Sequence, residues 1–271
     1  MPDNTHRFTG RAQDYDRYRQ RYPTDEILTQ LRAWCGLAPQ WLIADIGAGT
    51  GMLAEVFLAN GNRVLAIEPN SDMRQQMRDL FPQSMQLEIL DATAEITTLP
   101  NASVDMVAAG RAFHWFDTHR ALAEFRRILK PGGWVTLVAI DRAREEAGPL
   151  YRDQIAAYES LMETHSPDYV RVRSGFRAYD KMDTLFDGEI HQLQLPGVRL
   201  LDWPTFRGHT MSLSVAPGPE HPNNAAFLRD LRRYFDTFAH AGVYTMPTTC
   251  WITAANFRMQ SLPAFGISSR L

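Results

Sequence analysis

The chain has 271 residues, a formal net charge of −3 and 45% hydrophobic residues. Apolar content at the globular average excludes a disordered chain, and the lack of a basic excess argues against nucleic acid as a partner. The cysteines, Cys35 and Cys250, form no CxxC pair and have no histidine at zinc-ligand spacing, so neither disulfides nor a metal site are expected. No apolar run approaches the ~18–20 residues of a membrane span, and residues 1–10 lack a signal-peptide core. We therefore expect a cytoplasmic globular protein, monomeric or homodimeric, that does not bind membranes.

Short apolar runs alternate with helical patterns between about residues 41 and 140, which is typical of a parallel α/β sheet. Strands are expected at 42–46, 64–67, 85–90, 104–109 and 134–140. Helices are expected at 52–59, from Asn70 or Ser71 with Met73, Met77 and Leu80 on one face, and from Asp117 with Leu122, Phe125 and Leu129 inward. Pro131-Gly132-Gly133 is expected to end the last of these helices.

The flanking segments have different patterns. Residues 1–40 are helical with alternating Arg, Asp and Tyr, and residues 141–187 are helical and rich in arginine. Strands are expected at 189–195 and 244–254. We predict an N-terminal helical lid (1–40), a sheet core (41–140), a helical insertion lining a pocket (141–187), and C-terminal strands and helices that complete the sheet (188–271).

The strongest motif is the turn Asp45-Ile46-Gly47-Ala48-Gly49-Thr50-Gly51 between a strand and a helix. Glycines let the backbone approach a ligand closely, and the helix N-terminus behind them favours negative charge. Glu68 ends the next strand, where a carboxylate can accept both ribose hydroxyls of an adenosine cofactor. Separately, each feature also fits a tight turn or a solvated strand-end acid. Together they favour a nucleotide-like cofactor.

The glycine spacing distinguishes two cofactors. A dinucleotide fingerprint is GxGxxG, whereas here the third glycine comes one residue early and Asp45 precedes the first. This D-x-G-x-G-x-G turn resembles motif I of class I S-adenosylmethionine-dependent methyltransferases.

Further motifs extend this resemblance over about residues 41–140. Residues 67–73 (IEPNSDM), 92–105 (ATAEITTLPNASVD) and 126–133 (RRILKPGG) are similar to segments of the ubiquinone/menaquinone-biosynthesis type. Thr93 stands where the family has Asp, which leaves mainly the Ala94 backbone for adenine. The resemblance implies a Rossmann-like α/β fold, with a seven-stranded, mostly parallel sheet whose last strand is antiparallel, helices on both faces and a helical lid. It also implies these cofactor-binding residues: Tyr18, Arg19, Asp45, Gly47, Ala48, Gly49, Gly51, Glu68, Pro69, Met73, Thr93, Ala94, Ala109 and Gly110.

Two segments are similar to small-molecule members, including trans-aconitate-methyltransferase-like proteins. These are the opening with Phe8-Thr9-Gly10 and Tyr15 to Pro23, and residues 112–117 (AFHWFD). Arg19 suits the methionine carboxylate of the cofactor, since a guanidinium binds carboxylates bidentately. The expected acceptor pocket contains Tyr15, Tyr22, Arg111, His114, Trp115 and Phe116.

His114 and the arginines after residue 140 each leave two interpretations open. His114 is the candidate catalytic base, because its ordinary pKa is near neutrality, but it also fits a structural wall of the pocket, and we favour the wall. The arginines after residue 140 either face an anionic substrate or form a solvated helical face, and we favour the solvated face. They are Arg142, Arg144, Arg152, Arg171, Arg173 and Arg177. The fourth strand ends without the [DN]PP[YF] turn or a cysteine, which disfavours nucleic-acid methylation.

The sequence therefore predicts SN2-like methyl transfer from S-adenosyl-L-methionine to a small organic acceptor, leaving S-adenosyl-L-homocysteine, without a metal. One alternative is an NAD(P)-dependent oxidoreductase, which the glycine spacing disfavours. Another is a protein that binds S-adenosylmethionine and uses the sulfonium without methyl transfer.

Overall fold

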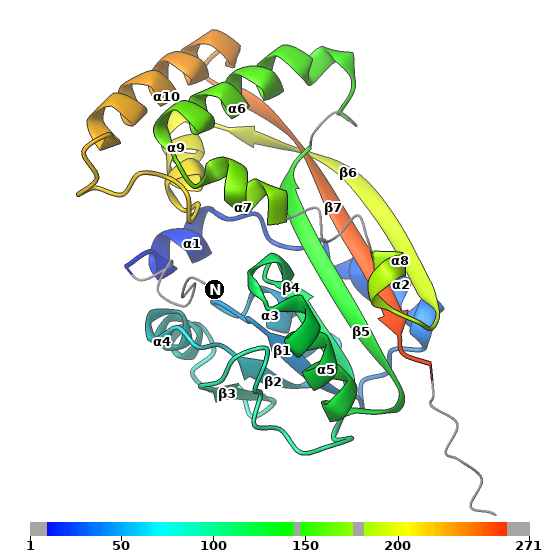
Figure 1. The fold of residues 1–271 in the computed structure, drawn as a ribbon. Helices are drawn as coiled ribbons and strands as arrows, with labels where there is room; N and C mark the ends of the chain where they lie inside the picture. Colours follow the sequence, from blue (N-terminus) through cyan, green and yellow to red (C-terminus); the bar gives the residue numbers. More distant parts are fainter. Residues whose placement is uncertain (1–9, 144–146, 176–181, 259–271) are drawn as a thin grey trace, which may run out of the picture.

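The computed structural model describes residues 10–143, 147–175 and 182–258, and these contain a seven-stranded sheet (Figure 1). The strand order is β3-β2-β1-β4-β5-β7-β6. The strands are β1 Leu42–Ile46, β2 Arg63–Ile67, β3 Leu87–Leu90, β4 Val104–Gly110, β5 Leu129–Arg142, β6 Ile190–Leu201 and β7 Tyr244–Asn256. β1 to β5 pair in parallel, and β7 is antiparallel to both β5 and β6. This confirms the predicted fold class.

Helices cover both faces of the sheet core. α2 (Thr24–Cys35) and α3 (Met52–Ala59) pack with Ile43, Met106 and Val138 on one face, where α4 (Ser71–Leu80) also lies, through Met77 against Ala66. α5 (Thr118–Ile128) packs on the other face, which also receives the Leu185 side chain from the end of the short helix α8 (Met182–Leu185). Alternate residues of each strand reach opposite faces, so a buried parallel strand needs apolar residues throughout.

A second group of helices forms a cap at the far ends of β5, β6 and β7, in the upper part of Figure 1. Its members are α6 (Arg152–His165), α7 (Tyr169–Gly175), α9 (Trp203–Met211) and α10 (Asn224–Phe238), with the 3-10 turn η3 (Pro149–Tyr151) before α6. The cap has its own apolar cluster, in which Phe206, Phe227 and Tyr244 are fully buried. Half of this cap, α9 and α10, comes from the segment between β6 and β7.

The N-terminal helix α1 (Ala12–Tyr18) joins the core to the cap. The Gly10 amide donates to Asp72 at the start of α4 (2.9 Å). On the cap side, the Arg11 guanidinium donates to three backbone carbonyls, those of Met211, Leu213 and Ala216. The N-terminal end of α1 is thus attached to both the core and the cap, at residues more than 60 positions away along the chain.

Several predicted boundaries were wrong. α5 ends at Ile128, and Leu129 is the first residue of β5, where it pairs with Val104. Pro131-Gly132-Gly133 therefore lies after the helix end, inside the extended segment. β3 begins at Leu87, where its pairing with Val64 of β2 starts, and Met85 before it is 97% exposed. β6 continues to Leu201 because antiparallel pairing with β7 satisfies its backbone beyond the sequence pattern.

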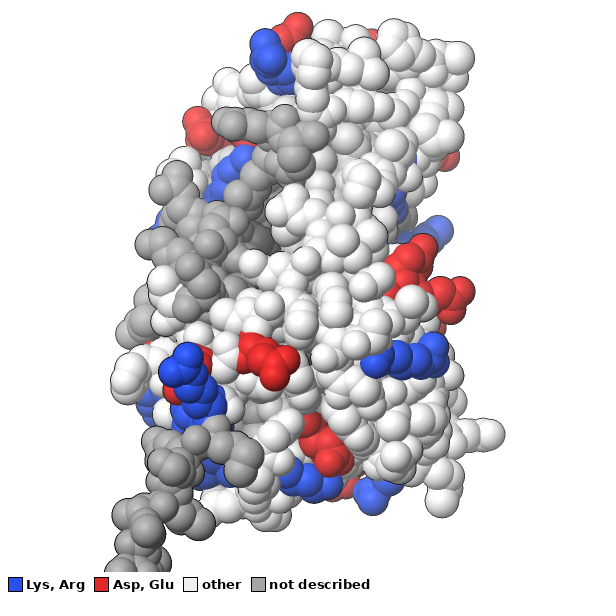
Figure 2. Space-filling view, turned by 90° about the vertical axis from the view of Figure 1, so that its right-hand side faces the viewer, with Lys and Arg blue, Asp and Glu red and all other residues white. Residues whose placement is uncertain are grey.

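The surface is mixed in charge. On the face shown in Figure 2, basic and acidic side chains are scattered among uncharged ones. Within the described part of the chain, no helix is long and apolar enough to cross a membrane.

Candidate functional site

The glycine turn lies at the carboxyl end of β1, directly before α3. The amides of Gly47 and Ala48 both donate to the carbonyl of Ile67, at 2.8 and 3.1 Å, which fixes the turn against the end of β2. Gly47 has φ +66°, and a Cβ there would lie 2.7 Å from the Cβ of Ala112. Gly51 has φ +88°, and its Cβ would lie 2.9 Å from the Phe81 ring. Only glycine satisfies both the left-handed backbone and the lack of space.

Glu68 closes one side of this turn. Its carboxylate accepts the amide of Gly49 (2.9 Å) and the amide of Asn70 (2.8 Å), and the side chain is buried. Burial raises the pKa of Glu68, against the opposing effect of these two amides. A carboxylate offers about four acceptor positions, so two remain after these bonds for hydroxyl donors.

Two buried polar groups in the turn have no hydrogen bond of good geometry within the described structure. They are the Asp45 carboxylate, fully buried, and the Thr50 hydroxyl. Burial raises the pKa of Asp45 to about 7, although the backbone of Ala54 opposes the shift. Unpaired polar groups are costly inside a protein and often mark places where a ligand supplies the partner. These residues fit a cofactor bound over the turn.

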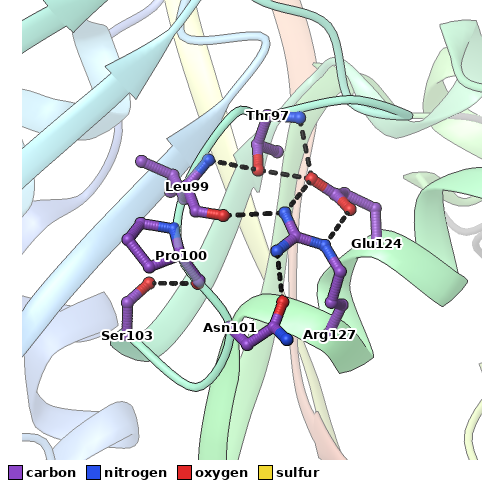
Figure 3. Close-up of polar contacts among 7 residues, drawn as sticks. All are labelled: Thr97, Leu99, Pro100, Asn101, Ser103, Glu124 and Arg127. Carbon is purple, nitrogen blue, oxygen red and sulfur yellow. Dashed lines mark hydrogen bonds and ion pairs between the residues drawn. The ribbon is translucent and has the colours of Figure 1, made fainter.

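The loop after β3 forms another wall of the candidate cofactor site, and a polar cluster holds this loop in place (Figure 3). Glu124 of α5 accepts the amide of Thr97 at 2.8 Å and is paired with Arg127 at 2.7 Å. Arg127 also donates to the carbonyl of Leu99 and to Asn101. Hydrogen bonds from Arg127 lower the pKa of Glu124 to about 2, and they outweigh the opposing effect of the burial of Glu124. The cluster fixes this loop, in which Ala94 is buried and Thr93 bridges to Ile96.

The other residues of the predicted cofactor set lie around the same strand ends. Met73 is buried in the first turn of α4, where its amide donates to Asn70, and Pro69 is half-buried. Ala109 is fully buried near the end of β4. A Cβ on Gly110 would lie 2.7 Å from the Tyr22 hydroxyl.

A pocket lies between the end of β4 and the cap. Its lining from the core includes Arg111, His114 and Trp115, and its lining from the N-terminal segment is Tyr15 and Arg19. Arg19 and Arg111 both lie over the Tyr15 ring, at 4.9 and 5.5 Å from the centroid. The structure thus brings together five predicted site residues from two distant segments.

His114 sits in the 3-10 turn η1 (Phe113–Trp115). Its ring lies 4.5 Å from the Trp115 ring, centroid to centroid. Burial and the nearby charge of Arg19 lower the pKa of His114 to about 3. The imidazole is therefore neutral at physiological pH and has a low affinity for a proton, which makes it a weak general base.

Three predicted residues lie apart from this pocket lining. The Tyr18 ring packs on α9, where a Cβ on Gly208 would be 2.6 Å away. Tyr22 is buried with the core cluster behind Arg111, whose guanidinium lies 5.0 Å from its ring. Phe116 packs over Gly47, and its ring would lie 3.3 Å from a Cβ on that glycine.

The favoured interpretation of the arginines after residue 140 was wrong for two of them. Arg142 is only 9% exposed and lines the pocket, as does Arg173. Arg152 and Arg171 are exposed, as a solvated face requires. Arg144 and Arg177 lie outside the described residues.

Sequence reasoning missed the cap side of the pocket. The lining there includes Tyr158, Glu159, Tyr169 and His209. These residues come from α6, α7 and α9, and no short motif connects them. The only signal was the aromatic content of amphipathic helices, which fits ordinary packing equally well.

Comparisons with known proteins agree with this geometry. Residues 44–137 match a family model described as a methyltransferase domain. An uncharacterized methyltransferase of Mycobacterium tuberculosis is 37% identical over 124 residues, which cover 46% of this chain and 48% of that protein. The chain thus matches about half the length of such curated relatives.

Solved structures share the fold over most of the chain. A structure described as a type II methyltransferase from Anaeromyxobacter dehalogenans has a TM-score of 0.62 at 23% identity, covering 88% of this chain and 98% of that one. A structure described as a methyltransferase from an antibiotic biosynthesis pathway of Anabaena variabilis has a TM-score of 0.55 at 20% identity, covering 85% and 98%. The chain therefore contains a methyltransferase domain match at residues 44–137, which include the glycine turn, Glu68 and His114, within a fold that it shares with structures described as methyltransferases.

Proposed function

We propose that this protein transfers a methyl group from S-adenosyl-L-methionine to a small organic acceptor. The observation that carries the proposal is the adjacency of two sites. A glycine turn with a buried carboxylate lies at the ends of β1 and β2, and a pocket lined by core and cap residues lies beside it at the end of β4. Ligands of open α/β sheets bind at these carboxyl strand ends.

Residues of the turn and around it would hold different parts of the cofactor. Glu68 would accept the ribose hydroxyls with its two remaining acceptor positions, and the turn backbone would lie against the amino-acid portion. Arg19 is our choice for the cofactor carboxylate, because its Nε is buried and has no hydrogen-bond partner in the described structure. When bound, the cofactor supplies an activated methyl group on its sulfonium.

The remaining residues would align the acceptor and keep water out. Tyr15 and Trp115 supply aromatic walls, and aromatic faces also favour a sulfonium cation. The lowered pKa of His114 supports its role as a wall residue rather than a base. An acceptor atom that is already nucleophilic, such as a carboxylate or thiolate, fits this site because it needs no strong base.

Titration calorimetry with S-adenosylmethionine, S-adenosylhomocysteine and NADH tests the cofactor. We expect both sulfur compounds to bind and NADH not to bind. A labelled-methyl assay on a metabolite extract then tests turnover. NADH binding in place of S-adenosylhomocysteine would reject the proposal, and cofactor binding without any labelled product would favour use of the sulfonium without methyl transfer.

A further inference from the structure

We propose that Arg142 and Tyr158 form a carboxylate-binding subsite at the cap end of the pocket, which holds a part of the acceptor remote from the methylated atom. The inference rests on the proposed function and defines its substrate class: an organic acid. Both side chains line the pocket, and they are 9% and 4% exposed.

Arg142 is a buried cation without an acidic partner among the described residues. Its Nη1 donates to the hydroxyl of Tyr244 (2.5 Å) and lies 3.4 Å from that of Tyr234. Its Nη2 is buried and makes no hydrogen bond. Aromatic rings stabilise the charge in part, with the guanidinium carbon 3.6 Å from the Tyr158 centroid. A buried guanidinium with an unpaired nitrogen destabilises the folded protein unless an anion binds to it.

Neither carboxylate that lines the pocket forms an ion pair with Arg142, although Asp141 is near enough to raise the pKa of Arg142. The Asp141 carboxylate accepts the backbone amide of Arg142 at 2.8 Å. Glu159 forms an ion pair with Arg173, which also donates to the hydroxyl of Tyr169. Arg142 therefore keeps unused donor capacity toward the pocket, whereas Arg173 of α7 is paired with Glu159 of the neighbouring helix α6.

Tyr158 supplies a second free donor. Its hydroxyl is buried and, although Thr210 is close enough to affect its pKa, makes no hydrogen bond of good geometry. One N–H group from Arg142 and one O–H from Tyr158 match the two oxygens of a planar carboxylate. A phosphate has more acceptor oxygens than these two donors can satisfy.

The position of Arg142 along β5 sets the size of the acceptor. Gly110, the last residue of β4, pairs with Val138. Arg142 lies four residues further along β5 in the sequence, or about 13 Å at ~3.3 Å per residue. The subsite is therefore well separated from the end of β4, where methyl transfer is proposed. An extended acid, rather than a compact one such as acetate, spans this separation.

The test uses the full chain saturated with S-adenosylhomocysteine, and dicarboxylates from succinate to suberate as probes in ligand-observed NMR. We expect the longer members to bind and their diamides not to bind. Arg142→Gln should weaken binding at least tenfold, and Tyr158→Phe several-fold. Arg152→Gln, an exposed arginine nearby in the sequence, is the matched control and should bind as wild type does.

Calorimetry with S-adenosylhomocysteine on each variant separates a local effect from misfolding. Arg142→Gln should retain the wild-type affinity, and Tyr158→Phe, which keeps the ring under the guanidinium, serves if Arg142→Gln does not fold. Equal dicarboxylate binding in wild type and both variants, tighter binding of diamides, or preferential binding of inorganic phosphate would each overturn the subsite. Loss of S-adenosylhomocysteine binding by the wild type would instead reject the proposed function.

Discussion

The two halves of the site are constructed differently. The proposed cofactor half lies over the glycine turn and is formed largely by backbone groups and by residues close in sequence, with Gly47, Gly49 and Glu68 at adjacent strand ends. The proposed acceptor half is formed by side chains from the N-terminal segment, the end of β4, η1, β5, α6, α7 and α9. The first half therefore tolerates few substitutions, whereas the second can change its specificity by exchanging side chains.

The same contrast holds for how charge is accommodated. In the core, Glu68 is buried but accepts two backbone amides, and Glu124 is paired with Arg127. In the cap, the buried Arg142 has aromatic rings and tyrosine hydroxyls as its neighbours. In the core, Glu68 and Glu124 are thus satisfied by the protein, with Asp45 as the exception, while the cap retains a positive charge available to a ligand.

The largest effect should come from filling the glycine turn. Gly47→Ala places a methyl group in a left-handed position and against Ala112. We expect a loss of about 2–5 kcal/mol in the free energy of unfolding, the sum of backbone strain and overpacking. Gly132→Ala is the matched control, because it has φ +77° but open space around it, and should cost only about 1–2 kcal/mol. Equal losses in urea unfolding would show that the turn is not closely packed.

Asp45 should give the stability of the core an unusual pH dependence. Its folded pKa, about 7, is above its ordinary value of 3.8, so its stabilising effect is fully present below pH ~4 and is lost as the pH rises to ~7. Relative to wild type, Asp45→Asn should gain up to about 4 kcal/mol between these pH values. Asp202→Asn should instead gain stability relative to wild type as the pH falls, because hydrogen bonds from Thr205 lower the Asp202 pKa. Parallel stability curves for wild type and Asp45→Asn would contradict the assignment.

Glu68→Ala should weaken S-adenosylhomocysteine binding by ~1.5–3 kcal/mol, the scale of hydrogen bonds to a charged group. Asp79→Asn, an exposed change in α4, should leave the affinity unchanged. Glu68→Gln keeps an acceptor oxygen for only one of the two amides, of Gly49 or of Asn70, and should fall between the two. An unaltered dissociation constant in calorimetry of Glu68→Ala would remove Glu68 from the cofactor site.

Tyr244→Phe tests the cap without touching the turn. It leaves Arg142 Nη1 without its 2.5 Å acceptor, so the free energy of unfolding should fall by ~1–3 kcal/mol. The affinity for S-adenosylhomocysteine should not change, since Tyr244 lies in the cap cluster. A matching loss of cofactor affinity would mean that the two halves are energetically coupled.

The smallest effect is expected at His114. With a pKa of about 3, its ring resonances should not shift between pH 5 and 8, unlike those of free imidazole in a reference peptide. NMR titration measures this directly. A midpoint near 6.5 would restore His114 as a candidate base, and His114→Asn would then be expected to lower kcat by ~10²–10⁴.

The sequence predicted the positions of the glycine turn and of Glu68 at adjacent strand ends closely because their signals are local. A glycine turn between a strand and a helix requires the same backbone wherever it occurs, and a strand-end carboxylate follows at a regular distance. The alternation of apolar runs predicted the sheet, and helix boundaries failed only where extended pairing continued past the pattern, as at Leu129. Cap helices α9 and α10 lacked such motifs and could be expected only as unspecified helices.

By itself, the sequence determined the sheet, the turn and the acid that faces it, because short-range backbone geometry and burial leave few alternatives there. Only the tertiary structure decided that Arg142 is a buried pocket residue, since its partner Tyr244 is 102 residues away along the chain. The tertiary structure likewise lowered the proton affinity of His114, because burial and Arg19 act only after α1 packs across the end of β4. Burial and long-range contacts set the properties of a charged side chain, and a local pattern contains neither.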